Sequence, residues 1–183
     1  MKTKTLPTKK ASKKKVTAKK VAVNKVTPKT RRVAVGSVAP LFLLHSTAGN
    51  VVSAKGLKGV RYVLYFYPKD MTPGCTVEAH EFTALAKKFA KSNVQVFGIS
   101  PDDIESHLKF VKKDNISFPL LADEDHKVAE AFGVWVEKSM YGRKYMGINR
   151  STFVVGVGGK IEAIYRDVKP EGHAVCVLED LNK

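Results

Sequence analysis

The sequence predicts an α/β protein in which a central mixed β-sheet is flanked by helices, preceded by a basic tail. Three observations lead to this prediction. Apolar runs rich in β-branched and aromatic residues alternate with segments whose apolar residues recur at helical spacing. Two adjacent apolar runs near the C-terminus are separated by Gly158-Gly159, which is typical of a hairpin. The chain has 183 residues and is 44% hydrophobic, which is enough for one domain with a core.

The first predicted elements lead up to the only cysteine in the first half of the chain. Residues 39–59 contain two apolar stretches around a Gly-Asn turn, which indicates two short strands and a polar loop. Residues 60–67, "VRYVLYFY", form a central strand that stops at Pro68. Residues 73–91 form an amphipathic helix, because their lysines lie off the apolar face. That face consists of Phe82, Leu85, Ala86 and Phe89.

The remaining elements follow the same alternation. We expect a strand at 94–100, a helix at 102–115, a short strand at 118–123, a helix at 123–134, a hairpin at 151–168 and a final helix at 170–183. Phe132 and Trp135 are expected to pack in the core or at an interface. Tyr141, Arg143 and Lys144 lie in a Gly-flanked basic loop, which either borders the substrate mouth or is only solvated.

The positive charge is concentrated at the N-terminus. Residues 1–32 hold 13 of the 32 Lys and Arg and none of the 17 Asp and Glu, so the remainder carries a net charge of only +2. We therefore expect a disordered basic tail over residues 1–34 and one domain over residues 35–183. The tail resembles those of linker histones and histone-like bacterial proteins, and the expected roles are non-specific DNA contact or a nuclear address. The residues assigned to this role are Lys9, Lys10, Lys13, Lys14, Lys15, Lys19, Lys20, Arg31 and Arg32.

Other interpretations of the tail stay open. One is a solvated extension. Another is a mitochondrial presequence, which is less favoured because such segments are rich in Arg and this tail holds eleven Lys against two Arg. The chain has no apolar run of about 18 residues, so no membrane span is expected. Having only two cysteines, it has no disulfide framework, which suits a reducing intracellular compartment. That compartment is the cytoplasm or nucleoid of a bacterium, or the nucleus of a eukaryote.

Cys75 lies where the central strand passes into the first helix. Thr72 suits the N-cap and Pro73 the first helical position, so Cys75 falls at about the third. Free backbone N–H groups and the positive end of the helix dipole favour a thiolate there, and the Thr72 hydroxyl lies within reach. The pattern indicates a nucleophile in preference to a packed core cysteine.

The stretch "PKDMTPGC" places Pro68, Thr72 and Cys75 at the P-x-x-x-T-x-x-C spacing of peroxiredoxins. The longer stretch "FYPKDMTPGCTVEA" resembles the bacterioferritin comigratory protein, or peroxiredoxin Q, subfamily of these AhpC/TSA-like proteins. The resemblance continues through "FGVWVEKSMYGRKYMGINRSTFVV", which contains Arg150, to "GHAVCVLEDL". It implies a thioredoxin-like fold and reduction of hydrogen peroxide and organic hydroperoxides, with no metal, flavin or haem cofactor.

The resemblance also implies roles for the site residues. Cys75 is the peroxidatic nucleophile and becomes a sulfenic acid. Thr72 hydrogen-bonds the sulfur and the peroxide, Arg150 stabilises the thiolate and the developing oxygen charge, and Pro68 shields the thiolate from water.

Two carboxylates, Asp70 and Glu78, also match family positions. Glu78 lies within the apolar stripe of its helix, so we expect a buried carboxylate with a partner.

Many members of the subfamily carry a resolving cysteine five residues after the first, where this chain has His80. We expect His80 to be an exposed helix residue beside Lys87 and Lys91, without a metal, because no second ligand lies at i+3 or i+4. Cys176 is also expected to be exposed. It resolves the sulfenic acid within a monomer or across a homodimer, or it is incidental.

The favoured interpretation is a one-cysteine peroxidase cycle. Thioredoxin, glutaredoxin or a low-molecular-weight thiol would then complete turnover. The alternative is a nucleic-acid-associated protein in which the tail dominates and the peroxidase domain is auxiliary, redox-sensing or chaperone-like.

Overall fold

The computed structural model describes Met1, residues 33–140 and residues 142–183. Residues 2–32 of the predicted basic tail, with the nine Lys and Arg assigned to nucleic-acid contact, lie outside the described residues, as does Tyr141. Within the described part, no helix is both long enough and apolar enough to cross a bilayer.

The described residues form a main sheet of seven strands. These are β1 (Leu43–Ser46), β2 (Val51–Ser53), β3 (Arg61–Phe66), β4 (Val94–Ser100), β5 (Leu120–Ala122), β8 (Ser151–Val155) and β9 (Ile161–Arg166). Their order across the sheet is β2-β1-β5-β4-β3-β8-β9. Strands β3, β4 and β5 run parallel, whereas β1 and β8 are antiparallel to their neighbours β5 and β3. The prediction of a mixed central sheet is confirmed.

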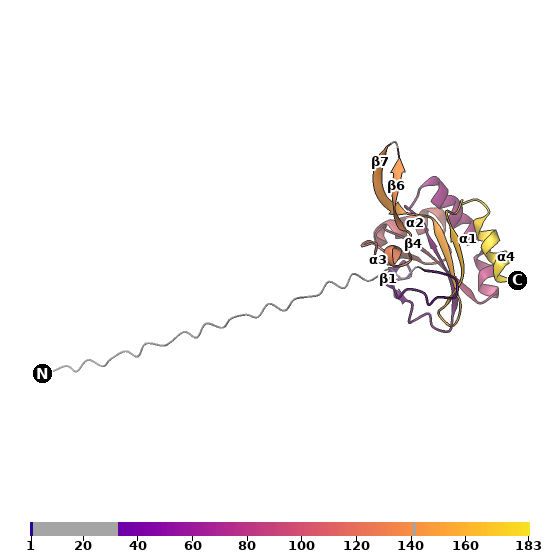
Figure 1. Ribbon diagram of the computed structural model, residues 1–183, viewed down its shortest axis with the longest axis horizontal. Helices are drawn as coiled ribbons and strands as arrows, with labels where there is room; N and C mark the ends of the chain where they lie inside the picture. The colour runs from indigo at the N-terminus through magenta and orange to yellow at the C-terminus, as the bar shows by residue number, and fades with distance from the viewer. Residues whose placement is uncertain (2–32, 141) are drawn as a thin grey trace.

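Helices cover both faces of this sheet, as expected. Residues of α1 (Pro73–Lys91), α2 (Ile104–Asp114) and α4 (His173–Leu181) pack in one core cluster, and those of α3 (Lys127–Ala131) pack in the other. Helices α1 and α4 contact each other along one side of the molecule (Figure 1).

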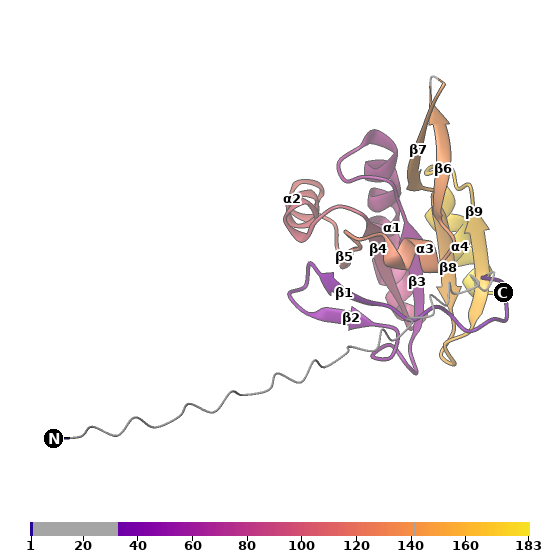
Figure 2. The same cartoon turned by 60° about the vertical axis from the view of Figure 1, so that its left-hand side comes forward.

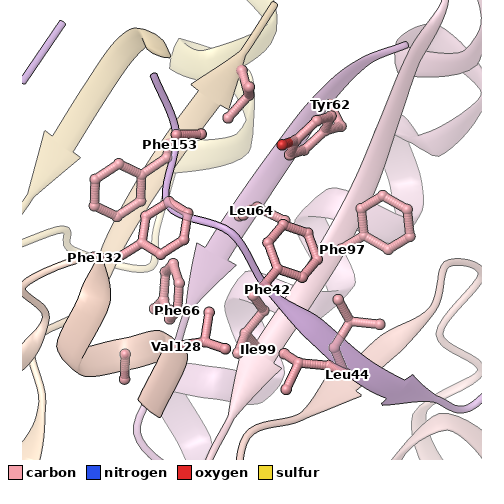
Figure 3. Close-up of a cluster of buried hydrophobic side chains, with 14 of the residues drawn as sticks. Phe42, Leu44, Tyr62, Leu64, Phe66, Phe97, Ile99, Val128, Phe132 and Phe153 are labelled. Carbon is pink, nitrogen blue, oxygen red and sulfur yellow. The ribbon is translucent and has the colours of Figure 1, made fainter. Parts of the chain in front are cut away.

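The central strand β3 separates the two halves of the core. Tyr62, Leu64 and Phe66 belong to one cluster, and Val63, Tyr65 and Tyr67 at its end belong to the other. This explains why residues 62–67 are apolar or aromatic without alternation, because both faces of this central strand are covered. Figure 3 shows the first cluster, where the rings of Phe66, Phe132 and Phe153 gather beside the strands. The second cluster includes Cys75.

The loop expected around residues 141–147 is a β-hairpin instead. Strands β6 (Trp135–Met140) and β7 (Arg143–Ile148) pair with each other and form their own two-stranded sheet. The hairpin stands out from the rest of the domain (Figures 1 and 2). Most of β7 is exposed on both faces, so its sequence lacks the period-2 apolar pattern from which a strand is predicted.

Three helices begin later than expected, and the one predicted at 102–115 begins at Ile104 after its N-cap Asp103. The helix predicted at 123–134 is reduced to α3, because the buried Asp123 carboxylate accepts hydrogen bonds from the amides of Val128 and Ala129 at 3.1 and 2.7 Å. The turn before it has a left-handed residue, His126, with φ 60°. The helix predicted at 170–183 begins only after Gly172, whose φ is 76°. Phe132 is buried in the core as expected, and Trp135 is half-buried and stacks on His126.

Candidate active site

Cys75 is the third residue of α1, as the sequence predicted, and only 1% of it is exposed. Strand β3 ends at Phe66, and an irregular segment connects it to the helix. Within this segment Met71 adopts a left-handed conformation with φ 56°, which is unfavourable for a side chain with a Cβ. Pro73, which has no N–H to leave unpaired, then opens the helix. The sulfur is thereby placed at the positive end of a 19-residue helix.

Thr72 occupies the N-cap with an extended backbone, as the sequence predicted, but its side chain makes no capping hydrogen bond to the helix. Its hydroxyl donates to the carbonyl oxygen of Lys69 at 3.1 Å. The hydroxyl proton is therefore directed back into the loop, and the oxygen lone pairs stay available to accept. Pro68 is exposed, so its proposed shielding of the thiolate stays a prediction.

Arg150 is brought to Cys75 from the other half of the chain. It follows β7 and precedes β8, and its Nη2 donates to the Cys75 Sγ at 3.3 Å. The guanidinium side chain is only 14% exposed. A full positive charge at hydrogen-bond distance in a poorly solvated site stabilises a thiolate strongly.

Glu78 holds the other side of the same guanidinium. It is fully buried and forms an ion pair with Arg150 Nη1 through Oε2. Burial raises the pKa of the Glu78 carboxyl to about 7, although Arg150 acts in the opposite direction. The expected buried carboxylate with a partner is confirmed. Because Nη1 and Nη2 bind different residues, Glu78 fixes the orientation in which Arg150 faces the sulfur.

The segment before α4 lies against Arg150 and the first turn of α1. The Val168 amide donates to the Arg150 carbonyl at 3.1 Å. Pro170 packs against Gly74, because a Cβ added at Gly74 would lie 3.2 Å from the Pro170 Cγ. Glu81 of α1 accepts a hydrogen bond from the Gly172 amide at 2.6 Å, so a side chain of one helix caps the next. Nothing in the spacing of the sequence predicted this cap, because the two residues are far apart in the chain.

Among the described residues, none of the remaining candidates forms a hydrogen bond or ion pair with Cys75. Cys176 is exposed on α4, as expected, and both cysteines are free thiols. His80 is exposed and contacts Asp114 at the end of α2, with 3.2 Å between Nε2 and Oδ1. Arg143 and Lys144 are exposed on the hairpin, and no hydrogen bond or ion pair between described residues connects them to Cys75 or Arg150. Among the described side chains, no group of three potential ligands is arranged to hold a metal ion.

A buried thiol held against a guanidinium at a helix N-terminus defines a class of proteins, the thiol-dependent redox proteins. Residues 35–164 match the model of the AhpC/TSA family, and the chain belongs to that family.

Curated and solved relatives define the subgroup. The chain is 44% identical to peroxiredoxin Bcp of Bacillus subtilis over 149 residues, which cover 81% of this chain and 95% of the relative. It is 43% identical to peroxiredoxin Bcp of Escherichia coli, again over 81% and 95% of the two chains.

A solved peroxiredoxin Q variant of Xylella fastidiosa is 36% identical with a TM-score of 0.78, covering 82% of this chain and 96% of the other. The bacterioferritin comigratory protein of Xanthomonas campestris, whose trapped complexes concern alkyl peroxide reduction, is 40% identical with a TM-score of 0.74. That match covers 77% and 90% of the two chains. The fold is therefore thioredoxin-like and the protein is a thiol-dependent peroxidase.

Proposed function

We propose that Cys75 is the peroxidatic nucleophile of a one-cysteine cycle that reduces hydrogen peroxide and organic hydroperoxides. The observation that carries this proposal is the 3.3 Å hydrogen bond from Arg150 Nη2 to the Cys75 sulfur, at the start of α1. The thiolate attacks the terminal oxygen of the hydroperoxide. An S–O bond forms as the O–O bond breaks, which leaves a sulfenic acid on Cys75 and an alkoxide or hydroxide that takes a proton from water.

Arg150 and Thr72 act on the oxygens during this step. Arg150 has a guanidinium edge near the sulfur, so it can donate to the leaving oxygen as negative charge develops there. Thr72 accepts a hydrogen bond from the hydroperoxide O–H through a free lone pair, while its own hydroxyl proton is donated to the Lys69 carbonyl. The two groups together orient the O–O bond toward the sulfur.

An external thiol completes turnover in this proposal. One thiol displaces water from the sulfenic acid and forms a mixed disulfide, and a second thiol releases reduced Cys75 as the external disulfide forms. The support is that His80 cannot form a disulfide and that the second cysteine, Cys176, faces solvent on α4 while Cys75 is buried. Thioredoxin, glutaredoxin and low-molecular-weight thiols are all candidate reductants.

The test is mass spectrometry under non-reducing conditions after one equivalent of hydrogen peroxide, on the wild type, Cys75→Ser and Cys176→Ser. A gain of one oxygen atom on a monomeric wild type and on Cys176→Ser, trapped by a sulfenic-acid reagent at Cys75 and lost in Cys75→Ser, supports the one-cysteine cycle. Loss of two hydrogens or a covalent dimer in the wild type, but not in Cys176→Ser, would instead make Cys176 the resolving thiol.

For the basic tail we propose salt-sensitive, non-specific contact with DNA that keeps the peroxidase near nucleic acid, in the nucleoid or the nucleus. The support is charge alone, since residues 1–32 carry 13 Lys and Arg and no acid. Gel retardation at low salt, with and without residues 1–34, tests it. Equal retardation of the two proteins would contradict the proposal, and unchanged peroxidase activity is expected in both.

A further inference from the structure

The loop that connects β3 to α1 is anchored by a buried carboxylate, Asp70, two residues before Thr72. The Asp70 side chain is 1% exposed and has three side-chain hydrogen-bond partners. Tyr67 Oη donates to Oδ1 at 2.7 Å, Ser106 Oγ donates to Oδ2 at 2.8 Å, and His107 Nδ1 lies 2.8 Å from Oδ2. Burial raises the pKa of Tyr67 well above its ordinary value, so its phenol stays a donor.

His107 is the central partner in this network, and it is fully buried in α2. Its Nε2 is 3.2 Å from the carbonyl oxygen of Leu121 in β5, which can only accept, so Nε2 carries a proton. Its Nδ1 faces the Asp70 carboxylate, which also accepts. The ring therefore bridges the Asp70 carboxylate and the Leu121 carbonyl, and it connects the loop to both α2 and β5.

The backbone of Asp70 is held as firmly as its side chain. The Asp70 amide donates to Asp102 Oδ2 at 2.8 Å, and the same oxygen accepts from Ser100 Oγ at 2.7 Å. Only Met71, in its left-handed conformation, separates this anchored residue from Thr72 at the N-cap of α1. A single strained residue leaves little freedom between the two, so the position of Asp70 determines where α1 begins.

We infer that Asp70 and His107 are positioning residues of the peroxidase reaction, which hold Thr72 and the first turn of α1 in the geometry that receives the hydroperoxide. This inference rests on the proposed function and deepens it. Neither residue touches the sulfur, so they act through Thr72 and the start of the helix. Stability alone is a weak explanation for this pair, since replacing both partners of a buried hydrogen bond by apolar groups of similar shape is often nearly neutral for the stability of a fold.

The chain contains a matched control. His80 and Asp114 form a second His–Asp contact between α1 and α2, but His80 is more than half exposed and the contact does not involve the loop. The experiment compares His107→Leu, His107→Asn and Ser106→Ala with His80→Leu in the full chain. Asn at position 107 retains a donor near Nδ1, so His107→Asn should retain more of the positioning than His107→Leu.

Two reactions of Cys75 are measured on each variant whose circular dichroism matches the wild type. The first is the second-order rate constant with hydrogen peroxide, and the second is the rate of alkylation by iodoacetamide, which needs only an accessible thiolate. We expect the peroxide rate constant of His107→Leu to fall by about 10- to 100-fold. His107→Asn and Ser106→Ala should show smaller losses, and His80→Leu should show none. Alkylation should be unchanged throughout.

Several results would overturn the inference. Equal peroxide rate constants in wild type, His107→Leu and Ser106→Ala would show that the network has no positioning role. Parallel losses in peroxide reaction and alkylation would indicate a general effect on Cys75. If His107→Leu does not fold, Ser106→Ala and His107→Asn decide the question by the same two rates. A wild type that reacts with peroxide no faster than a free thiol would instead contradict the proposed function.

Discussion

Replacing Glu78 with Gln should change how the stability of the protein depends on pH. Burial raises the pKa of this carboxyl from its ordinary 4.5 to about 7, with Arg150 acting against the increase. The folded state therefore holds a proton more tightly than the unfolded state. The contribution of the protonated Glu78 carboxyl to the unfolding free energy is therefore fully present below pH 4.5 and is lost as the pH rises toward 7.

The size of the effect follows from the two pKa values. The gap between 4.5 and about 7 corresponds to about 3 kcal/mol of unfolding free energy. Gln has a similar shape but no titratable proton, so the variant lacks this pH dependence. The wild-type unfolding free energy minus that of Glu78→Gln should fall by about 3 kcal/mol between pH 4.5 and 7 and be flat above and below this range.

Urea unfolding of both proteins at half-unit steps from pH 4 to 8.5 measures this difference, because titrations shared by the two proteins cancel. Asp114→Asn, which changes a carboxylate away from the sulfur, is a suitable control for the effect of losing a charge. A difference that is flat or that rises between pH 4.5 and 7 would refute the reasoning, because Glu78 would then be ionised throughout and Arg150 would outweigh its burial.

Three further predictions concern the contacts around the site. Arg150→Met should lower the rate constant with hydrogen peroxide by about 100-fold or more, measured by stopped flow, because the donor to the sulfur and leaving oxygen is lost; an unchanged rate would exclude this role. Glu81→Gln should lower the unfolding free energy by about 1 kcal/mol through a weaker cap on α4, with the exposed Glu179→Gln as the unaffected control. Gly98→Ala should cost about 1–3 kcal/mol in urea unfolding, since its Cβ would lie 2.7 Å from the Tyr65 hydroxyl, and a neutral result would mean that the ring moves freely.

Local sequence patterns were sufficient to predict the part of the site that the start of α1 supplies. The start of α1 was predictable because Thr72 and Pro73 are residue types that helices select at their first positions. Helical periodicity also predicted that Glu78 is buried, and burial requires a partner. The direction of the Thr72 side chain was not predictable in the same way, since a hydroxyl that donates to a nearby carbonyl competes with the N-cap geometry in which it accepts from a helix amide.

The other half of the site depends on distant contacts that no local rule predicts. Arg150 is 75 residues from Cys75, and its approach follows from the pairing of β8 with β3. From the sequence, its role came only from a resemblance to peroxiredoxins. His107 was not recognised at all, although it precedes the buried Phe110 by one helical turn, which is a sign that it faces the core. A histidine on an apolar face needs polar partners, and here the partner was a carboxylate in a loop.

In the proposed one-cysteine cycle an outside thiol reduces Cys75, and the geometry of α1 limits how that thiol reaches the sulfur. Five residues along an α-helix correspond to a rotation of about 140°, so the side chain at position 80 cannot face that at position 75 while α1 is intact. His80 is instead exposed and contacts Asp114, which joins this part of α1 to α2. Cys75 is 1% exposed, so the sulfenic acid is equally hard to reach from outside. The reductant must therefore either be small enough to enter beside Arg150 or act when the first turn of α1 opens.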